Sequence, residues 1–329
     1  MIHFALIGAG KHGTRWAGVL AKYGCLDIIV DTNYKKAEEL ANIYKCNSAS
    51  DFSEINQINF WEIEAVVVAT PHKFLSDLSR KALESGIHVL CEKPGANKAD
   101  QIKKNIELAK KKKLVYKIGY NYRFHDGFIK ARKLFDKGVI GDLLFIRAVH
   151  GFGGREGYEK EWRINKDIGG GGHLHDQGTH LIDMAKSYLG DVKRVSGFMA
   201  DTYWKAGTED NAFVLLQNKK GIIASIHSSL TQWKRKHTFE IYGTKGYLII
   251  EGLGMRYGEP EKLIFGKRTK DPDVVKERII KCNPIADNSL ALELKEFISA
   301  IKKGTPLSPT PLDAYETLRL VEEVYRSNK

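Results

Sequence analysis

The chain has 329 residues, of which 43% are hydrophobic, and its 52 lysines and arginines outnumber its 40 aspartates and glutamates to give a formal net charge of +12. This is the composition of a globular protein and excludes a disordered one. The length suits two domains, each large enough to bury a core without disulfide or metal staples. Apolar runs are far shorter than the ~20 residues that span a bilayer, so we expect no transmembrane helix and no membrane partner.

The first residues run directly into an apolar segment and a glycine motif, with no basic leader and no cleavage site. The four cysteines, at positions 25, 46, 91 and 282, match neither a metal-binding nor a redox spacing. We therefore predict a cytoplasmic protein with free thiols. The densest basic run, residues 110–113, closes a predicted helix, where positive charge complements the helix dipole. We expect no nucleic-acid partner, because no basic helix with base-reading side chains accompanies it.

Residues 1–121 alternate short β-branched runs with segments of helical periodicity, which is typical of a parallel sheet covered on both faces. The predicted strands are 3–7, 27–30, 65–69, 88–91 and 114–118, and the predicted helices are 14–22, 35–44, 74–85 and 99–112. This order predicts an α/β fold, a doubly wound nucleotide-binding domain of the Rossmann type.

Residues 122–329 have a different rhythm, in which longer strands follow one another across turn-like breaks. The predicted strands are 143–149, 194–203, 211–217, 222–230, 237–242 and 247–251. Consecutive strands joined by tight turns indicate a mostly antiparallel sheet. Two helices, 290–302 and 312–325, are predicted to close the chain. We therefore expect a second, α+β domain over 122–329.

Three glycines form a G-x-G-x-x-G motif between the first predicted strand and the first predicted helix. Gly8 permits a tight turn, Gly10 lets the backbone approach a pyrophosphate, and Gly13 lets helix and strand pack closely. Asp31, at the end of the next strand, can accept both adenosine ribose hydroxyls and repels a 2′-phosphate, which favours NAD. The alternatives are a turn that binds another ligand or none, and NADP held by polar neighbours: Asn33, Lys35 and Lys36.

Two later strands of the same sheet end in Ala69-Thr70-Pro71-His72 and in Cys91-Glu92-Lys93-Pro94. Ligands of open α/β sheets bind at the carboxyl ends of strands, so both segments are predicted to face the nicotinamide end of the cofactor. Lys93 could be an ordinary surface lysine. Its place at a strand end, followed by a stiffening proline, instead favours an ammonium group held over a reaction site.

The segment from Gly169 to Asp183 contains a glycine run and then a helical pattern that begins at Asp176. Asp176 and His180 are spaced i,i+4, which predicts that they share a helix face as a carboxylate and a general base. A core histidine beside a capping aspartate is an equal alternative. Zinc held with His173 and His175 is another, less favoured because the glycine run would leave both histidines poorly fixed.

Taken together, several motifs resemble those of the glucose-fructose oxidoreductase, inositol dehydrogenase and MocA family, over essentially the whole chain. They are Gly8-Ala-Gly-Lys-His-Gly13, Ala69-Thr-Pro71, His88-Val-Leu-Cys-Glu-Lys-Pro94, Tyr122-Arg-Phe124, Gly170-Gly-Gly-His-Leu-His-Asp-Gln-Gly-Thr-His180 and Tyr242-Gly-Thr-Lys-Gly246. The resemblance implies a Rossmann domain followed by a domain with a large open, mostly antiparallel sheet, whose exposed face commonly mediates homodimers or homotetramers.

The resemblance also implies a metal-free catalytic set of Lys93, Asp176 and His180. His180 would take the hydroxyl proton, Lys93 would hold and polarise the reacting oxygen, and Asp176 would orient its neighbours. The implied cofactor-binding residues are Gly8, Gly10, Lys11, His12, Gly13, Asp31, Thr32, Thr70, Pro71, His72, Glu92, Lys93 and Asn121. One residue departs from the family pattern, since Leu75 stands where many members have histidine.

A glycine-rich loop, residues 151–163, precedes the Asp176 segment and mixes aromatic and basic residues that suit a sugar or polyol. An ordinary ordered loop is the alternative, and Arg123 could be a structural ion-pair member instead of a substrate ligand. The expected substrate-binding residues are Lys93, Arg123, Tyr158, Trp162, Arg163, Asp176 and His180.

The sequence thus predicts an NAD(P)-dependent oxidoreductase that transfers a hydride between nicotinamide and a secondary alcohol or ketone. The substrate would be a cyclic polyol, a sugar or a nucleotide sugar. One alternative is a reductase of another carbonyl or imine, similar to dihydrodiol or biliverdin reductases. A non-catalytic cofactor-binding regulator is the other, and it predicts loss of the catalytic residues, all of which are present.

Overall fold

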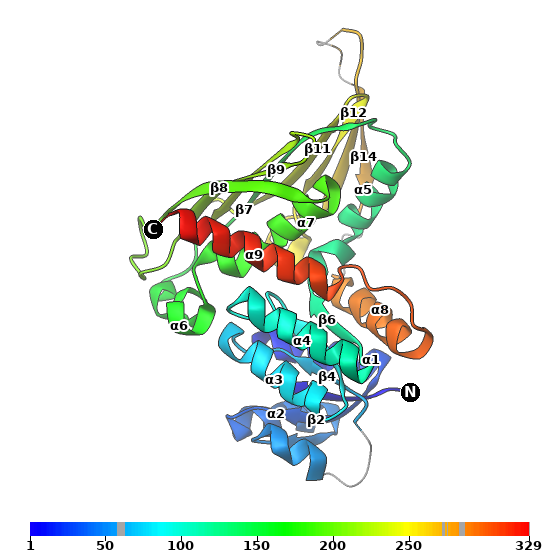
Figure 1. The fold of residues 1–329 in the computed structure, drawn as a ribbon, viewed down its shortest axis with the longest axis vertical. Coiled ribbons are helices and arrows are strands. Elements are labelled where there is room, and N and C mark those ends of the chain that lie inside the picture. Colours follow the sequence, from blue (N-terminus) through cyan, green and yellow to red (C-terminus); the bar gives the residue numbers. More distant parts are fainter. Residues whose placement is uncertain (58–62, 272–273, 275, 283–286, 329) are drawn as a thin grey trace. The chain divides into compact units, whose positions relative to one another are not determined.

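The computed structural model describes residues 1–328 except 58–62, 272–273, 275 and 283–286 (Figure 1). The chain divides into two compact units. The first unit contains Met1–Tyr120 and Leu290–Glu316, and the second contains Asn121–Ser289 and the residues from Thr317 onward. The sequence-based division at 121/122 assigned everything from residue 122 onward to the second domain. The segment 290–316 differs from that expectation because its helix belongs to the hydrophobic core of the first unit.

The first unit is built on a parallel sheet with the strand order β3-β2-β1-β4-β5-β6. Its strands are β1 (His3–Ile7), β2 (Cys25–Val30), β3 (Asn47–Ala49), β4 (Ala65–Val68), β5 (His88–Glu92) and β6 (Tyr116–Gly119). Its helices are α1 (Lys11–Tyr23), α2 (Tyr34–Tyr44), α3 (His72–Glu84), α4 (Ala99–Lys112) and α8 (Ser289–Lys303). The predicted doubly wound arrangement is confirmed, and the short strand β3 is an addition to it.

Helices α1, α2 and α8 share one hydrophobic core with strands of this sheet. Trp16 of α1 and Phe297 of α8 are fully buried there, and the rings of Phe4 and Phe297 lie 6.5 Å apart. Each buried side chain of this size stabilises the fold by about 1.5–3 kcal/mol. The buried ammonium of Lys117 on β6 lies 2.7 Å from a carboxylate oxygen of Glu296 on α8, which fixes that helix further. Helices α3 and α4 pack against each other.

The second unit is built on a sheet with the order β14-β13-β12-β11-β7-β10-β9-β8, antiparallel except between β7 and β10. Its strands are β7 (Leu143–Gly151), β8 (Val192–Ala200), β9 (Asn211–Asn218), β10 (Ile223–Ser229), β11 (Lys236–Gly243), β12 (Gly246–Glu251), β13 (Lys262–Lys267) and β14 (Lys276–Lys281). The helices that begin in this unit are α5 (Asp126–Asp136), α6 (Lys166–Gly169) and α7 (Thr179–Leu189), while α9 (Pro311–Ser327) ends in it. The predicted sheet is confirmed, whereas α5, β13 and β14 were not predicted.

One face of this sheet is covered by α5 and α7 and the other is open. Burial alternates along β9, so that Ala212, Val214 and Leu216 are buried while Phe213 and Leu215 are exposed. The strand register places further large apolar residues on the same open face: Phe145, Phe198 and Ile223. Within the described residues, no helix is both long and apolar enough to cross a bilayer.

Candidate active site

The glycine motif connects the end of β1 to the start of α1. Gly8 has φ +106°, and a Cβ there would lie 2.6 Å from the carbonyl oxygen of Ala69, while a Cβ at Gly13 would overlap the carbonyl oxygen of Gly8. These two glycines serve the turn and the packing of helix on strand. Gly10 differs, because no heavy atom lies within 4 Å of the position its Cβ would take. The space beside Gly10 is therefore open for a ligand.

Gly10, the N-cap residue of α1, provides no side-chain cap, and the helix begins directly after it at Lys11 and His12. The first backbone N–H groups of a helix lack partners within the helix and attract anions. An open approach at Gly10 and uncapped N–H groups are what a pyrophosphate requires. The motif thus fits the diphosphate of a dinucleotide cofactor.

Asp31 follows β2 and contacts the glycine loop through its carboxylate. One oxygen accepts a hydrogen bond from the backbone N–H of Ala9 (2.7 Å) and the other accepts one from the N–H of Asn33 (2.8 Å). The carboxylate is therefore fixed beside the loop, with Thr32 next to it in the chain. Lys35 and Lys36, in the exposed first turn of α2, keep NADP open as the sequence suggested.

The segment after β4 lies next to the glycine motif, because β4 pairs with β1 at the point where the strand order reverses. Thr70 is half-buried and its Cγ2 would lie 3.2 Å from a Cβ at Gly8. Pro71 precedes α3, and His72, the first residue of that helix, is buried. Leu75, in the same helix, is fully buried and therefore has a packing role. It occupies the position at which the sequence departs from the family pattern of histidine.

Glu92, the last residue of β5, is tied to α1 by two hydrogen bonds. Its Oε1 lies 2.6 Å from Nε2 of His12 and accepts a hydrogen bond from the Trp16 indole (2.7 Å). Burial pushes the pKa of Glu92 upward, but the His12 charge, these hydrogen bonds and the Lys93 charge outweigh it and leave the pKa lowered. Lys93 comes directly after this anchored carboxylate and is half-buried.

Asp176 and His180 lie at a junction between two kinds of helix. Asp176 is in a π-helical turn, Leu174–Gly178, and His180 is in the first turn of α7. The sequence predicted a helical pattern from Asp176, with Asp176 and His180 on one helix face, and did not foresee the π turn, which adds a residue before α7. Both side chains are buried. Gln177 donates a hydrogen bond to the Asp176 carboxylate (3.0 Å).

Tyr122 stacks on the imidazole of His180, with ring centroids 3.9 Å apart and planes 7° from parallel. Burial, followed by the charges of Tyr257 and Asp176, raises the pKa of the Tyr122 hydroxyl well above 10, so the ring stays neutral. His237 and His125 meet the same ring edge-on. The tyrosine therefore fixes the plane of the imidazole, a role that no sequence pattern signalled.

Arg123 forms a bidentate ion pair with Asp183 on α7. Its Nε and terminal nitrogen each donate a hydrogen bond of 2.7 Å to one of the two carboxylate oxygens. Asp183 is fully buried, three residues after His180. The structural ion pair considered from the sequence is thus what the structure shows for Arg123, and its substrate contact stays a prediction. Asn121, two residues earlier, donates a hydrogen bond to the Ser289 hydroxyl (3.0 Å).

The loop before α6 contributes one residue near Asp176 and one to a separate small core. Arg163 lies over the Trp162 ring and its Nε is 3.9 Å from the Asp176 carboxylate. Tyr158 instead packs with Ile164 and Leu230 in a buried cluster. The sequence predicted that the Tyr158 ring would stack on a substrate, whereas the structure uses it inside the protein.

The glycine run before the π turn is closely packed. A Cβ at Gly171 would overlap the hydroxyl of Tyr325, and one at Gly172 would overlap the carbonyl oxygen of Glu209. His173 and His175 are both buried. The expectation that the run leaves these histidines poorly fixed is therefore wrong, because the glycines allow close contact with neighbouring segments and do not loosen the chain.

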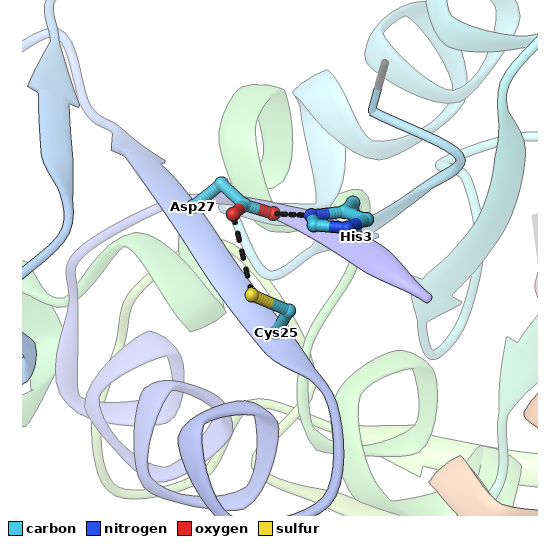
Figure 2. A group of neighbouring side chains, drawn as sticks. All are labelled: His3, Cys25 and Asp27. Carbon is cyan, nitrogen blue, oxygen red and sulfur yellow. Dashed lines mark hydrogen bonds and ion pairs between the residues drawn. The ribbon is translucent and has the colours of Figure 1, made fainter. Parts of the chain in front are cut away.

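Among the described residues, potential metal ligands gather at His3, Cys25 and Asp27, at the start of β1 and β2 (Figure 2). Nδ1 of His3 lies 3.1 Å from one Asp27 oxygen, and the Cys25 thiol donates a hydrogen bond to the other (3.3 Å). Burial, with the Asp27 hydrogen bond and charge, raises the pKa of Cys25 and so keeps the thiol protonated. We interpret this group as a hydrogen-bonded cluster at the end of the strands remote from the glycine motif.

The structure thus places Gly8, Gly10, Asp31 and Lys93 in the first unit and Asp176 and His180 in the second. Two family models match these parts of the chain. Residues 2–120 match the oxidoreductase family with an NAD-binding Rossmann fold, and residues 128–249 match the GFO/IDH/MocA C-terminal domain. The chain belongs to the GFO/IDH/MocA oxidoreductase family. Its first unit is accordingly an NAD-binding Rossmann domain, in agreement with the cofactor expected from the glycine motif.

Individual relatives agree with this assignment. Inositol 2-dehydrogenase of Rhizobium meliloti is 27% identical, over 99% of this chain and 96% of its own length. The 2,7-anhydro-N-acetylneuraminate hydratase of Escherichia coli is 25% identical, over 95% of this chain and 82% of its own. Among solved structures, levoglucosan dehydrogenase in complex with NADH and levoglucosan has the same fold, with a TM-score of 0.87 at 24% identity over 99% of this chain and 96% of that one.

Proposed function

We propose that the protein is an NAD-dependent dehydrogenase that acts on a secondary hydroxyl of a cyclic polyol, a sugar or a nucleotide sugar, or reduces the corresponding ketone. The observation that carries the proposal is the pairing of an open, uncapped glycine turn with intact Lys93, Asp176 and His180. A cofactor-binding regulator would have no need for these three residues.

In the proposed reaction, the alcohol carbon loses a hydride and the alcohol oxygen loses a proton, which leaves a ketone. NAD, when bound, supplies the hydride acceptor. His180 accepts the proton, with its ring held by Tyr122. Lys93 donates a hydrogen bond to the reacting oxygen and stabilises the negative charge that develops there. Asp176 orients its neighbours and supports the positive charge on the imidazole.

The geometry of the first unit supports the cofactor contacts that we propose. Gly8, Gly10 and Gly13 shape the turn for the diphosphate, with the N–H groups of Lys11 and His12 beside it. We propose that Asp31 and Thr32 contact the adenosine ribose, and that Thr70, Pro71 and His72 contact the nicotinamide half. Glu92 acts mainly through its bonds to α1. We keep Asn121 as a nicotinamide-side contact.

The substrate class is supported by what the relatives act on. The names of two of them refer to inositol and levoglucosan, which are cyclic polyhydroxy compounds. In this chain, Arg163 lies near the Asp176 carboxylate and over the half-buried Trp162 ring. The arginine can bind hydroxyl groups and the indole can stack on a ring face. Arg123 and Tyr158 are used inside the protein, so we expect them to support the substrate site indirectly.

We further propose that the protein is a cytoplasmic homo-oligomer whose copies join through the open face of the second sheet. Its four cysteines are free thiols, as in a reducing compartment. The open face has Phe198 82% exposed and Phe213 55% exposed. Two groups of stacked rings lie on its strands: Phe213 on His227, and Tyr242 between Phe145 and Tyr247. A large exposed apolar face of this kind marks an interaction surface.

A substrate panel tests the proposed function. The purified protein is incubated with NAD or NADP and a set of inositols, anhydrosugars, sugars and nucleotide sugars, and NADH formation is followed by absorbance. Product analysis accompanies it, because one relative is a hydratase and need not form net NADH. The proposal predicts NADH formation with at least one polyol or sugar. Cofactor binding without turnover of any substrate would favour the regulator.

A further inference from the structure

The start of the catalytic π turn is held by one residue from a distant part of the chain, Glu209. Three consecutive backbone N–H groups point to it. The N–H of Gly172 donates to Oε2 (3.1 Å) and the N–H of Leu174 donates to Oε1 (2.9 Å). Between them, the N–H of His173 donates to the backbone carbonyl of Glu209 (3.0 Å). Glu209 therefore holds residues 172–174, which lead into the π turn, by three hydrogen bonds.

Tyr325, near the end of α9, completes this arrangement. Its hydroxyl donates a hydrogen bond of 2.7 Å to Oε1 of Glu209 and accepts one of 3.3 Å from the N–H of Gly172. The glycines at 171 and 172 leave the room in which these two side chains approach the backbone. Removal of either partner would leave a buried polar group without its bond, which costs about 1–3 kcal/mol.

The bonds of Glu209 reach Asp176 through one residue, Gly172. The N–H of Asp176 donates to the carbonyl of Gly172 (3.1 Å), while the N–H of that same glycine is held by Glu209. The first N–H groups of a helical segment have no partners within it, so a carboxylate placed there fixes where the segment starts. The start of the turn in turn sets the direction of the residues after it.

We propose that Glu209 is a positioning residue for the reaction, which fixes the π turn so that Asp176 and His180 take up their working orientation. This inference rests on the proposed function of Asp176 and His180. Glu209 itself takes no part in proton or hydride transfer. Glu209 is only 7% exposed and all its described bonds go to the turn and to Tyr325, so its role is one of geometry.

The alternative is that Glu209 stabilises the fold and does nothing more. Asn218, at the other end of β9, offers a matched control, because its buried side chain accepts hydrogen bonds from the N–H groups of Lys220 and Ile222. It holds a surface turn about 30 Å along the chain from Glu209. Its amide also donates a hydrogen bond of 2.9 Å to the carbonyl of Leu189 at the C-terminal end of α7, but none of its described bonds goes to the π turn. Loss of either side chain should destabilise the protein, but only loss of Glu209 should misdirect the catalytic turn.

The test compares Glu209→Ala, Glu209→Gln, Tyr325→Phe and Asn218→Ala at a temperature where all are folded. We expect kcat to fall about a hundredfold in Glu209→Ala and less in the other two site variants, because a displacement of about 1 Å has an effect of this size. The glutamine retains one acceptor, so partial rescue is expected. The affinity for NADH should stay within about twofold in all four proteins, and Asn218→Ala should keep its kcat.

Hydrogen exchange of the amides of residues 172–176 gives a second measurement that needs no substrate. Faster exchange in Glu209→Ala, and not in Asn218→Ala, supports the positioning role. A kcat within a few-fold of wild type, or the same loss in Asn218→Ala, would overturn it. If the wild type oxidises no compound of the panel, the proposed dehydrogenase function fails. The exchange comparison then still shows whether Glu209 holds the turn.

Discussion

The glycine turn of the first unit and the π turn of the second both present chemical groups at the start of a helix, but they are held in place differently. In the glycine turn, backbone shape does most of the work, and Gly8, Gly10 and Gly13 are all within one short segment. The π turn and the start of α7 depend on side chains from far along the chain. Glu209 and Tyr325 hold the start of the turn, and Tyr122 and Arg123 contact His180 and Asp183 of α7.

This difference teaches which features of an active site can be altered independently. A cofactor-binding turn that lies within one short segment can be recognised from the sequence and transferred to another protein as a unit. A catalytic turn held by distant partners is sensitive to changes far from the reacting atoms. Substitutions in the first unit should therefore affect the cofactor or the reacting oxygen singly, whereas those in the second should spread through several contacts.

The largest expected effect is that of Lys93→Met. In the proposed mechanism Lys93 acts on the oxygen mainly in the transition state, so kcat should fall about a thousandfold while the fold and the affinity for NADH survive. Steady-state kinetics and a fluorescence titration with NADH measure the two quantities. Lys98→Met, at an exposed lysine of the same loop, is the control and should leave both unchanged. Activity within a few-fold of wild type would remove Lys93 from the mechanism.

Replacement of His180 tests the other side of the comparison. The oxidation rate of the wild type should rise with pH through the imidazole range, and His180→Asn should remove this limb and lower kcat about a hundredfold. Exhaustive treatment with a chelator should leave the wild-type rate unchanged, because the proposed mechanism activates the hydroxyl with Lys93 and His180 alone. A rate that is lost with the chelator and restored by zinc would instead show that zinc takes part in the reaction, with His173 and His175 as its ligands.

A smaller effect is expected on cofactor choice. A 2′-phosphate would bring negative charge against Asp31, so NADH should bind at least about tenfold more tightly than NADPH. In Asp31→Asn this preference should shrink, since the loop keeps an acceptor for its N–H groups but loses the charge. Titration of both reduced cofactors by fluorescence measures the ratio. Equal or reversed affinities in the wild type would show that Lys35 or Lys36 decides the choice.

The smallest effect on turnover is expected for Glu92→Gln, whose main consequence is on stability. The pKa of Glu92 in the folded protein is lowered from its ordinary value of 4.5. The ionised group therefore stabilises the fold above about pH 4.5, and this contribution is lost as the pH falls through the lowered pKa. The difference in unfolding free energy between wild type and variant should shrink from neutral to acid pH in denaturant titrations. A pH-independent difference would contradict the charged hydrogen bonds to His12 and Trp16.

The sequence was informative where structure is local. The alternation of strands and helices in residues 1–121, the glycine turn and most strands of the second sheet follow from periodicity within short windows. Strand β14 was not predicted because its outward positions are charged and it has no buried face. Helix α5 was missed because a glycine stands near its start. The hydrogen bonds by which Glu209 holds the start of the π turn join segments more than thirty residues apart, and no local sequence pattern encodes such contacts.

Helix α8 has a consequence for how the protein is made. The first 120 residues leave the ribosome with all strands of the Rossmann sheet, yet the face that contains Phe4 still lacks its partner Phe297. At about 5–20 residues per second, the missing helix follows roughly 10–35 s later. During that interval the nascent domain exposes an apolar face that can associate with other apolar surfaces. A fragment cut at residue 120 would keep that face permanently and should bind chaperones or aggregate.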